Sequence, residues 1–327
     1  METLELVCPA GTPAALRVAV TAGADAVYVG FRDETNARNF PGLNFSPEEL
    51  AEAIDFAHER GVKVYLAVNT YAKAGNNEPW IKAIDNADRL KVDAIILADI
   101  GLLDYAANKY PDLRLHLSVQ ASASNPTSIN FYVREFGVRR VVLPRVLSVS
   151  EIKEINGQID AGSEVFAFGG MCPMAEGRCS LSSYLTGQSP NMNGVCSPAS
   201  HVTYEQLGTG LASKLAGLTI NNFEEHEQVG YPTLCKGRFM ANGKTGYLFE
   251  EPTSLNISTI LPELIDAGVT AFKIEGRQRS KAYIGQVVKS FRLAVDKAKE
   301  NEKIEINMDH LSEGGGNTTG AFKKSWM

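Results

Sequence analysis

The stretch LELVCPAGTPAALRVAVTAGADAVYVGF (residues 4–31) contains the pattern that decides the fold. Two short, mostly apolar runs, Leu4–Cys8 and Asp25–Phe31, enclose a helical pattern at Thr12–Thr21. The helical pattern opens with Thr-Pro and stops at Gly23, which are common signals for the two ends of a helix. Continuous apolar runs are typical of parallel strands buried on both faces. The stretch therefore predicts a strand, a crossover helix and a second strand parallel to the first.

The same unit recurs along the chain. Further strand-like runs lie at Val62–Thr70, Asp93–Asp99, Leu113–Ala121, Arg139–Arg145, Glu164–Phe168 and Ala271–Glu275. Other helical patterns lie at Ser46–Arg60, Ile257–Ala267 and Ala282–Lys299. Eight strand-helix units with right-handed crossovers predict an α/β fold of the TIM-like (β/α)₈ barrel type, built as a single domain over residues 1–327. An open, doubly wound sheet is the alternative architecture.

Residues 170–252 interrupt this rhythm between the predicted strands 7 and 8. The segment is rich in Gly, Ser, Asn and Pro and contains four of the five cysteines. In a barrel it would emerge at the C-terminal face, where the active sites of such barrels lie. We therefore predict a long, irregular, functional insertion. A second Gly-rich segment, SEGGGNTTG at 312–320, predicts a flexible or ligand-facing loop near the C-terminus.

Composition and charge exclude some classes of protein. The net charge of −6 disfavours a general nucleic-acid or membrane-surface binder, which needs a basic face. No apolar run approaches the length of a membrane span, and the N-terminal residues lack the pattern of a signal peptide. Five cysteines in a chain of 327 residues do not indicate a disulfide framework, so we expect a cytoplasmic protein in which clustered cysteines bind metal or act in catalysis.

Four cysteines, Cys172, Cys179, Cys196 and Cys235, follow the spacing C-x₆-C-x₁₆-C-x₃₈-C. Four thiolates can complete a tetrahedral zinc site or hold an iron–sulfur cluster, and scattered cysteines can also be small buried hydrophobic residues. Arg178, Lys236 and Arg238 lie beside these cysteines and would offset the charge of the thiolates. The fifth, Cys8, ends the first predicted strand, and we interpret it as a core or barrel-mouth residue.

Polar side chains lie at the ends of the predicted strands, where a barrel places its mouth. These candidates for substrate binding are Asn36, Arg38, Asn69, Asp99, Gln120, Arg145, Glu275 and Arg277. Polar groups at the end of a buried apolar strand are costly unless they are satisfied, so several that converge indicate a binding site. The three arginines would suit a dicarboxylate, because guanidinium pairs bidentately with carboxylate. For each residue alone, a structural salt bridge or a loop hydrogen bond is the alternative.

No proteolytic motif is visible in the sequence. The five histidines have no metal-type spacing, and neither a His-Glu-x-x-His nor a Gly-x-Ser-x-Gly motif occurs. Glu176 lies between two of the cysteines, and we interpret it as a solvated carboxylate, with proton transfer or a contact with Arg178 as the alternatives.

The segment EVFAFGGMCPMAEGRCSLS (164–182) resembles the signature of peptidase family U32. The chain departs from that signature at Gly170, where the family has Ser or Ala. The strings CPAG (8–11), GADAVYVG (23–30) and KIEGR (273–277) are also similar to the family.

Longer strings resemble the members of this family that act in oxygen-independent ubiquinone (coenzyme Q) biosynthesis. They are TNARNFPGLNF (35–45), SVQAS (118–122), VVLPRVLS (141–148), YLTGQSPN (184–191) and GYPTLCKGR (230–238). The resemblance implies a [4Fe–4S] cluster on Cys172, Cys179, Cys196 and Cys235, a heterodimer with a shorter homologue, and hydroxylation of a ubiquinone ring precursor with prephenate as the hydroxyl donor. The alternatives are RNA hydroxylation, a zinc-dependent collagenase-like peptidase, and a scaffold whose partner performs the chemistry.

Overall fold

Eight parallel strands form a closed barrel at the centre of the computed structural model, which describes residues 4–174, 179–193 and 195–323. The strands are β1 (Glu5–Pro9), β2 (Ala26–Val29), β3 (Lys63–Val68), β4 (Ala94–Leu97), β5 (Leu115–Leu117), β6 (Arg140–Val142), β7 (Gly162–Gly170) and β14 (Ala271–Ile274). Strand β14 pairs with both β1 and β7 and so closes the barrel. The predicted TIM-like (β/α)₈ barrel is confirmed, and the open sheet is wrong.

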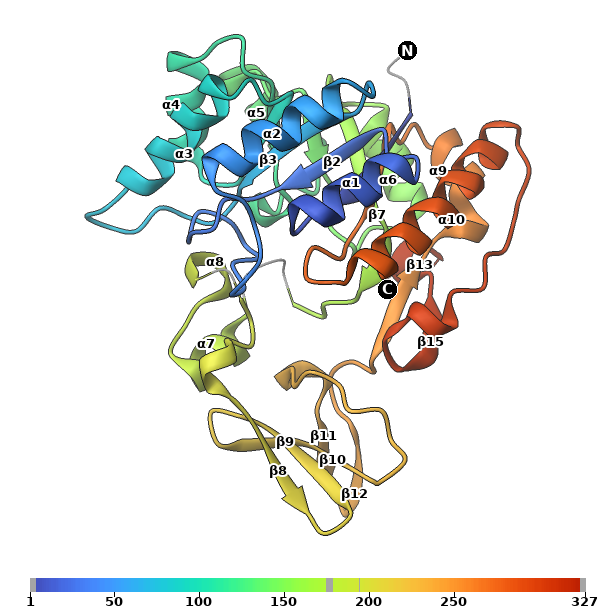
Figure 1. Ribbon diagram of the computed structural model, residues 1–327. Coiled ribbons are helices and arrows are strands. Elements are labelled where there is room, and N and C mark those ends of the chain that lie inside the picture. Colours follow the sequence, from blue (N-terminus) through green and yellow to red (C-terminus); the bar gives the residue numbers. More distant parts are fainter. Residues whose placement is uncertain (1–3, 175–178, 194, 324–327) are drawn as a thin grey trace.

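Helices surround the barrel on its outside (Figure 1). They are α1 (Pro13–Thr21), α2 (Pro47–His58), α3 (Glu78–Arg89), α4 (Ile100–Lys109), α5 (Pro126–Phe136), α6 (Val149–Asn156), α9 (Leu261–Asp266) and α10 (Lys281–Lys299). The start signals of the sequence are confirmed, because Thr12 and Ser46 cap α1 and α2 with their hydroxyl groups. The main hydrophobic core lies between strands and helices. Among the described residues, none of the helices has both the length and the apolar character needed to cross a membrane.

Charged and polar side chains fill part of the inside of the barrel, below the mouth that the C-terminal ends of the strands form. Glu5 accepts hydrogen bonds from Tyr65 and Arg140, each at 2.7 Å, and Glu164 accepts one from Lys273 at 2.6 Å. All five side chains are almost fully buried. Buried charges are tolerated when they are paired in this way. The floor beneath the mouth is therefore a fixed network of ion pairs.

The insertion has more regular structure than the sequence indicated. It contains α7 (Ser180–Thr186), α8 (Pro190–Asn193), η2 (Ala199–His201), an antiparallel sheet of β8 (Val202–Leu207), β9 (Gly210–Leu215) and β10 (Leu218–Phe223), η3 (Leu234–Lys236), and a hairpin of β11 (Arg238–Ala241) and β12 (Lys244–Tyr247). It projects from one end of the barrel (Figure 1). The prediction of an irregular insertion is wrong, because two-residue turns join its strands into antiparallel sheets. These strands are short and polar, so they lack the apolar runs by which the barrel strands were predicted.

The chain returns from the insertion through β13 (Thr253–Asn256), η4 (Ser258–Ile260) and α9. Strand β13 pairs antiparallel with β7 and parallel with β15 (Gly316–Thr318). The C-terminal part also contains η5 (Asp309–Leu311), η6 (Glu313–Gly315) and η7 (Gly320–Lys323). The segment 312–320, predicted to be a flexible or ligand-facing loop, is thus attached to the sheet through β15.

Candidate cysteine centre at the barrel mouth

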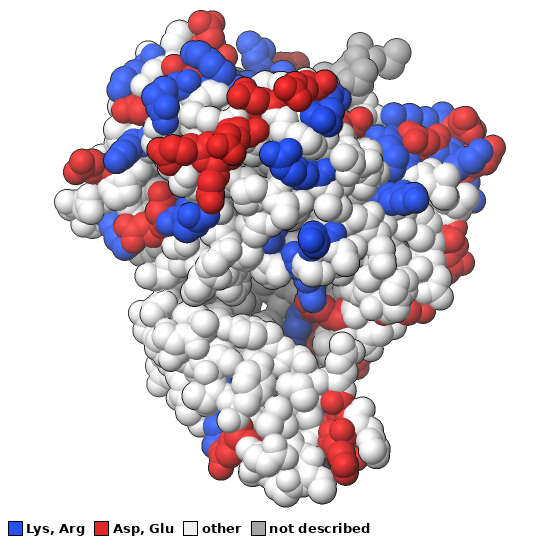
Figure 2. All heavy atoms as spheres, in the orientation of Figure 1, with Lys and Arg blue, Asp and Glu red and all other residues white. Residues whose placement is uncertain are grey.

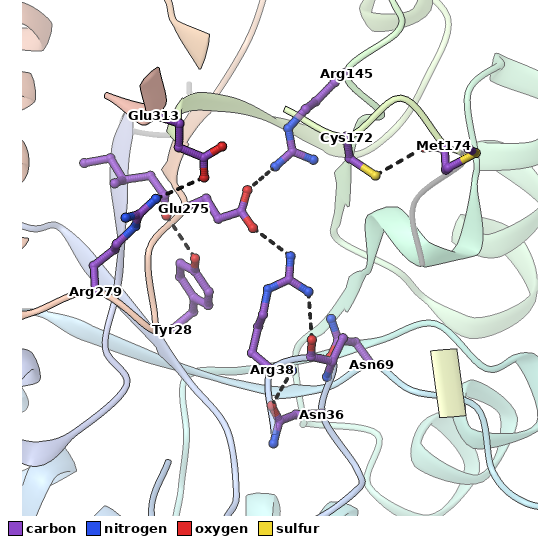
Figure 3. A network of polar contacts seen from close by, with 12 residues as sticks. Tyr28, Asn36, Arg38, Asn69, Arg145, Cys172, Met174, Glu275, Arg279 and Glu313 are labelled. Atoms are coloured by element: carbon purple, nitrogen blue, oxygen red, sulfur yellow. Dashed lines mark hydrogen bonds and ion pairs between the residues drawn. The ribbon is translucent and has the colours of Figure 1, made fainter. Parts of the chain in front are cut away.

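Three of the predicted site residues form one ion-pair network at the mouth. Glu275 accepts a hydrogen bond from Arg38 Nη2 at 2.7 Å through Oε1, and one from Arg145 Nη2 at 2.6 Å through Oε2 (Figure 3). Burial opposes the ionisation of Glu275, but Arg145 and then Arg38 outweigh this effect and lower its pKa to about 2. Glu275 is therefore a fixed negative charge between two guanidinium groups.

Asn36 and Asn69 hold the loop that carries Arg38. Asn36 Oδ1 accepts from the backbone N–H of Arg38 at 2.9 Å, and Asn36 Nδ2 donates to the carbonyl of Phe31 at 2.6 Å. Asn69 Oδ1 accepts from the backbone N–H of Ala37 at 3.0 Å. The structure thus gives these two predicted substrate-binding residues the role of orienting Arg38. Asp99, another of the predicted substrate-binding residues, caps the N-terminus of α4 with its side chain.

Arg277 and Gln120 carry unsatisfied polar atoms. Arg277 is 4% exposed, and its Nε and Nη1 have no hydrogen-bond partner within the described part of the chain. Burial lowers its pKa to about 10, and the charge of Arg38 acts in the same direction. The ring of Tyr28 lies 5.5 Å from its guanidinium carbon. The buried Oε1 of Gln120 is likewise unpartnered among those residues. Because buried polar groups are normally satisfied, both are candidates for contact with a bound molecule.

The four cysteines of the insertion come from four separate segments. Cys172 follows β7, Cys196 precedes η2, and Cys235 lies within η3. Cys179 is the N-cap of α7, and its Sγ accepts a hydrogen bond from the backbone N–H of Ser182 at 3.4 Å. Such N–H···S contacts stabilise a thiolate.

The other three insertion cysteines all act on the pKa of Cys235, so they lie within electrostatic range of its thiol. The pKa of Cys235 is raised to about 12, chiefly by burial and also by Cys172, Cys196 and Cys179, while Lys236 acts to lower it. Cys196 is exposed as a whole residue, yet loss of hydration around its thiol raises its pKa against the effect of Arg38. Arg38 therefore connects the cysteine centre with the network at the mouth.

The donor set consists of thiols with positive charges nearby. Over residues 4–174, 179–193 and 195–323, no three His, Cys, Asp or Glu side chains converge closely enough to share one metal ion. Four thiols with Lys236 and Arg38 beside them fit a group that binds one thiolate at each of several metal atoms, such as an iron–sulfur cluster. Cys8 is fully buried in the core, which is the first of the two positions expected for it. Glu176 and Arg178 lie outside the described residues.

The sequence did not single out Glu313 or Arg279. Glu313 forms ion pairs with Lys236 and with Arg279, the latter at 3.0 Å (Figure 3). Neither residue lies in a recognisable motif. The sequence feature that could have indicated Glu313 is that it is the single acidic residue of the Gly-rich segment 312–320.

Comparison with known proteins places these features in a family. The sequence profile described as peptidase family U32 matches residues 11–323. An uncharacterized protease of Methanocaldococcus jannaschii is 32% identical, over 90% of this chain and 66% of its own length. The tRNA hydroxylation protein P1 of Bacillus subtilis is 31% identical, over 94% of this chain and 67% of its own. The tRNA hydroxylation protein P of Escherichia coli is 31% identical, over 95% and 72%. The chain thus spans about two thirds of the length of these relatives.

Proposed function

The chain belongs to peptidase family U32, and from this premise we propose that it is the iron–sulfur subunit of an oxygen-independent hydroxylase of the UbiU type, acting in ubiquinone biosynthesis. The observation that carries the proposal is that the other three insertion cysteines lie within electrostatic range of Cys235, while Arg38 of the Arg38–Glu275–Arg145 network acts on Cys196. Relatives named for tRNA hydroxylation support a hydroxylase-like role. The resemblance of five long strings to proteins of ubiquinone biosynthesis supports the quinone substrate.

A [4Fe–4S] cluster bound to Cys172, Cys179, Cys196 and Cys235 would supply electron transfer or activation of the hydroxyl donor. The chain's own residues prepare the site for it. The backbone N–H of Ser182 donates to the sulfur of Cys179, and the positive charges of Lys236 and Arg38 favour ionised thiols. These contacts would also lower the electron density on the sulfurs.

The proposed hydroxyl donor, prephenate, is a dicarboxylate that requires cationic partners. Arg38 and Arg145 already bind Glu275, whereas two nitrogen atoms of Arg277 have no partner among the described residues. We therefore assign carboxylate recognition first to Arg277, with Gln120 as a neutral hydrogen-bonding group. Three arginines around one carboxylate give the mouth the positive balance that an anion needs.

The proposed partner is a shorter, UbiV-like member of the same family, in a heterodimer. Of the fourteen large hydrophobic residues that are exposed in the described part of the chain, ten lie between Tyr184 and Phe249 in the insertion. On the face shown in Figure 2, the insertion also has few charged side chains compared with the barrel. An exposed apolar surface of this kind is typical of a protein interface.

Metal analysis of protein purified without oxygen tests the cluster. We expect about four irons and four sulfides per chain, lost in Cys179→Ala and retained in the matched control Cys8→Ala, which alters the buried core cysteine. One zinc without sulfide would favour the zinc-dependent alternative and contradict the proposal.

RNA hydroxylation is the second candidate, favoured by relatives that are named for tRNA hydroxylation. A strain that lacks the gene, grown without oxygen, separates the two substrates. Loss of ubiquinone with normal RNA hydroxylation supports the first function. Normal ubiquinone with loss of a hydroxylated nucleoside supports the second and overturns the first.

A further inference from the structure

The carboxylate of Glu313 joins three parts of the molecule that are far apart in sequence. It pairs with Lys236 of the insertion and, at 3.0 Å, with Arg279 of the loop between β14 and α10. Glu313 itself belongs to η6 in the C-terminal segment. Figure 3 shows its carboxylate turned toward the guanidinium group of Arg279. Its position therefore links the insertion to the barrel at the site.

The backbone of the C-terminal segment fixes where this carboxylate lies. The N–H of Glu313 donates to Ser254 Oγ at 2.9 Å, and β15, which follows, pairs with β13. Gly314 has a φ of +59°, and a Cβ atom there would lie 2.3 Å from the carbonyl oxygen of Pro252. Only glycine permits this close approach. The segment is thus held against β13 on both sides of Glu313.

Gly170 provides the space that the carboxylate occupies. A Cβ atom at this position, the end of β7, would lie 3.0 Å from Oε1 of Glu313. That separation is shorter than an ordinary van der Waals contact, so a larger residue would displace the carboxylate or its backbone.

The two ion pairs lie in a partly dehydrated setting. The side chains of Lys236, Glu313 and Arg279 are 13%, 27% and 37% exposed. Charge pairs that are partly removed from water interact more strongly than exposed pairs. Among the ion pairs of the described residues, Lys236 pairs with Glu313. Lys236 directly follows Cys235 in the chain, so its position and that of the cysteine are coupled.

We propose that Glu313 is a positioning residue that holds Lys236, and with it the Cys235 segment, against the barrel mouth. The inference rests on the proposed function in one respect, because it takes Cys235 as a ligand of the cluster. The contacts of Glu313 do not depend on the cluster, and the test can therefore begin with metal-free protein.

Hydrogen exchange of the metal-free full chain tests the positioning directly. In Glu313→Gln, which keeps the shape and removes the charge, we expect the amides of residues 233–238 to exchange severalfold faster. The matched control is Glu302→Gln, which removes an exposed carboxylate paired with Lys297 on the surface. Unchanged exchange in Glu313→Gln would overturn the proposal. So would equally faster exchange in β2 of the barrel, because it would indicate general loss of stability.

A second variant approaches the same carboxylate from the other side. Gly170→Ala leaves every charge in place and crowds Glu313, so we expect faster exchange at 233–238 that is smaller than in Glu313→Gln. If residues 233–238 exchange at the wild-type rate in both Gly170→Ala and Glu313→Gln, the proposed link is contradicted.

The iron-loaded protein supplies a readout that a merely structural role would not change. Removal of the negative charge of Glu313 leaves Lys236 uncompensated beside Cys235, so the midpoint potential of the cluster should shift to more positive values, and a chelator should remove iron severalfold faster. Glu302→Gln should match the wild type in both measurements. If the wild-type protein binds no iron, the proposed function fails, and the exchange experiment still decides the role of Glu313.

Discussion

Glu275 organises the charges at the barrel mouth. It is the common partner of Arg38 and Arg145, which come from loops more than a hundred residues apart. The guanidinium of Arg145 also lies 3.5 Å from the ring centroid of Phe166, so its direction is fixed by two contacts. Without Glu275, Arg38 and Arg145 would lose the carboxylate that they share.

Glu275→Gln should therefore destabilise the protein by about 3 kcal/mol at pH 7, because it removes the charge of a buried carboxylate that pairs with both Arg38 and Arg145. Urea denaturation measures the change in the free energy of unfolding. The control Glu59→Gln, which alters an exposed ion pair with Arg60, should stay within about 0.5 kcal/mol of the wild type. Equal effects of the two variants would contradict the role given to Glu275.

The contribution of Glu275 should also depend on pH. Its pKa falls from 4.5 to about 2 in the folded protein, so its stabilising effect is complete above pH 4.5 and is lost as the pH falls toward 2. The difference in unfolding free energy between wild type and Glu275→Gln should thus be constant near neutral pH and shrink through this range. Denaturation curves at a series of pH values measure it, and a difference that grows at low pH would be inconsistent with this assignment.

Arg277 should show opposite effects on stability and binding. Arg277→Met removes a buried guanidinium with two unpartnered nitrogens, so we expect thermal stability to be unchanged or higher. Binding of prephenate, followed by calorimetry, should be lost. The control Arg139→Met changes an exposed arginine and should affect neither property. Retained prephenate binding in Arg277→Met would show that carboxylate recognition lies elsewhere.

At the scale of elements, α10 stabilises the closure of the barrel. It follows β14, the strand that pairs with both β1 and β7, and it packs against α1 and α9. Its apolar face is fully buried, and the ring of Phe291 lies 5.9 Å from that of Phe168 in β7. The helix thus connects the last strand with the first helix.

Phe291→Ala should cost about 3–5 kcal/mol of unfolding free energy, since it leaves a cavity between α10 and β7. Leu293 on the same helix is 56% exposed, and Leu293→Ala should change stability by less than about 0.5 kcal/mol. Both values come from the same denaturation experiment, and a small effect of Phe291→Ala would mean that the helix does not hold the closing strand.

The elements of the barrel could be predicted because local signals specify them. The apolar runs correctly predicted all eight barrel strands, and Thr12 and Ser46 correctly predicted where α1 and α2 begin. The predicted strand Leu113–Ala121 ends early at Leu117, since Ser118 caps the short helix η1 (Val119–Ala121). The hairpin of β11 and β12 was missed although Asn242-Gly243, a strong turn signal, lies between its strands.

The candidate site was predictable in its residues but not in its pairings. The strand ends placed Arg38, Arg145 and Glu275 at one face of the barrel, because all parallel strands end there. Which of them pair depends on side-chain directions across 237 residues of sequence, and no local pattern encodes that. The contact of Glu313 with Lys236 also joins residues far apart in sequence, so it could not be predicted either.

At the scale of the whole molecule, the chain enters and leaves the insertion at one place on the barrel. Its two ends lie side by side, because Gly170 of β7 and Ser254 of β13 are paired in an antiparallel ladder. Strands β8 to β12, α7 and η3 pack mainly against one another, and none of these elements belongs to the barrel sheet. The barrel therefore has its complete hydrogen-bonded wall without the insertion.

This arrangement predicts that the barrel folds when the insertion is removed. We expect a chain in which a Gly-Ser linker of about four residues replaces residues 173–250 to keep its helical circular dichroism and a cooperative thermal transition, because paired antiparallel residues lie about 5 Å apart and a short linker can connect them. The same chain should bind no iron, since three of the four cysteines are absent. A chain that loses its helical signal or its cooperative transition would instead show that the barrel needs the insertion to fold.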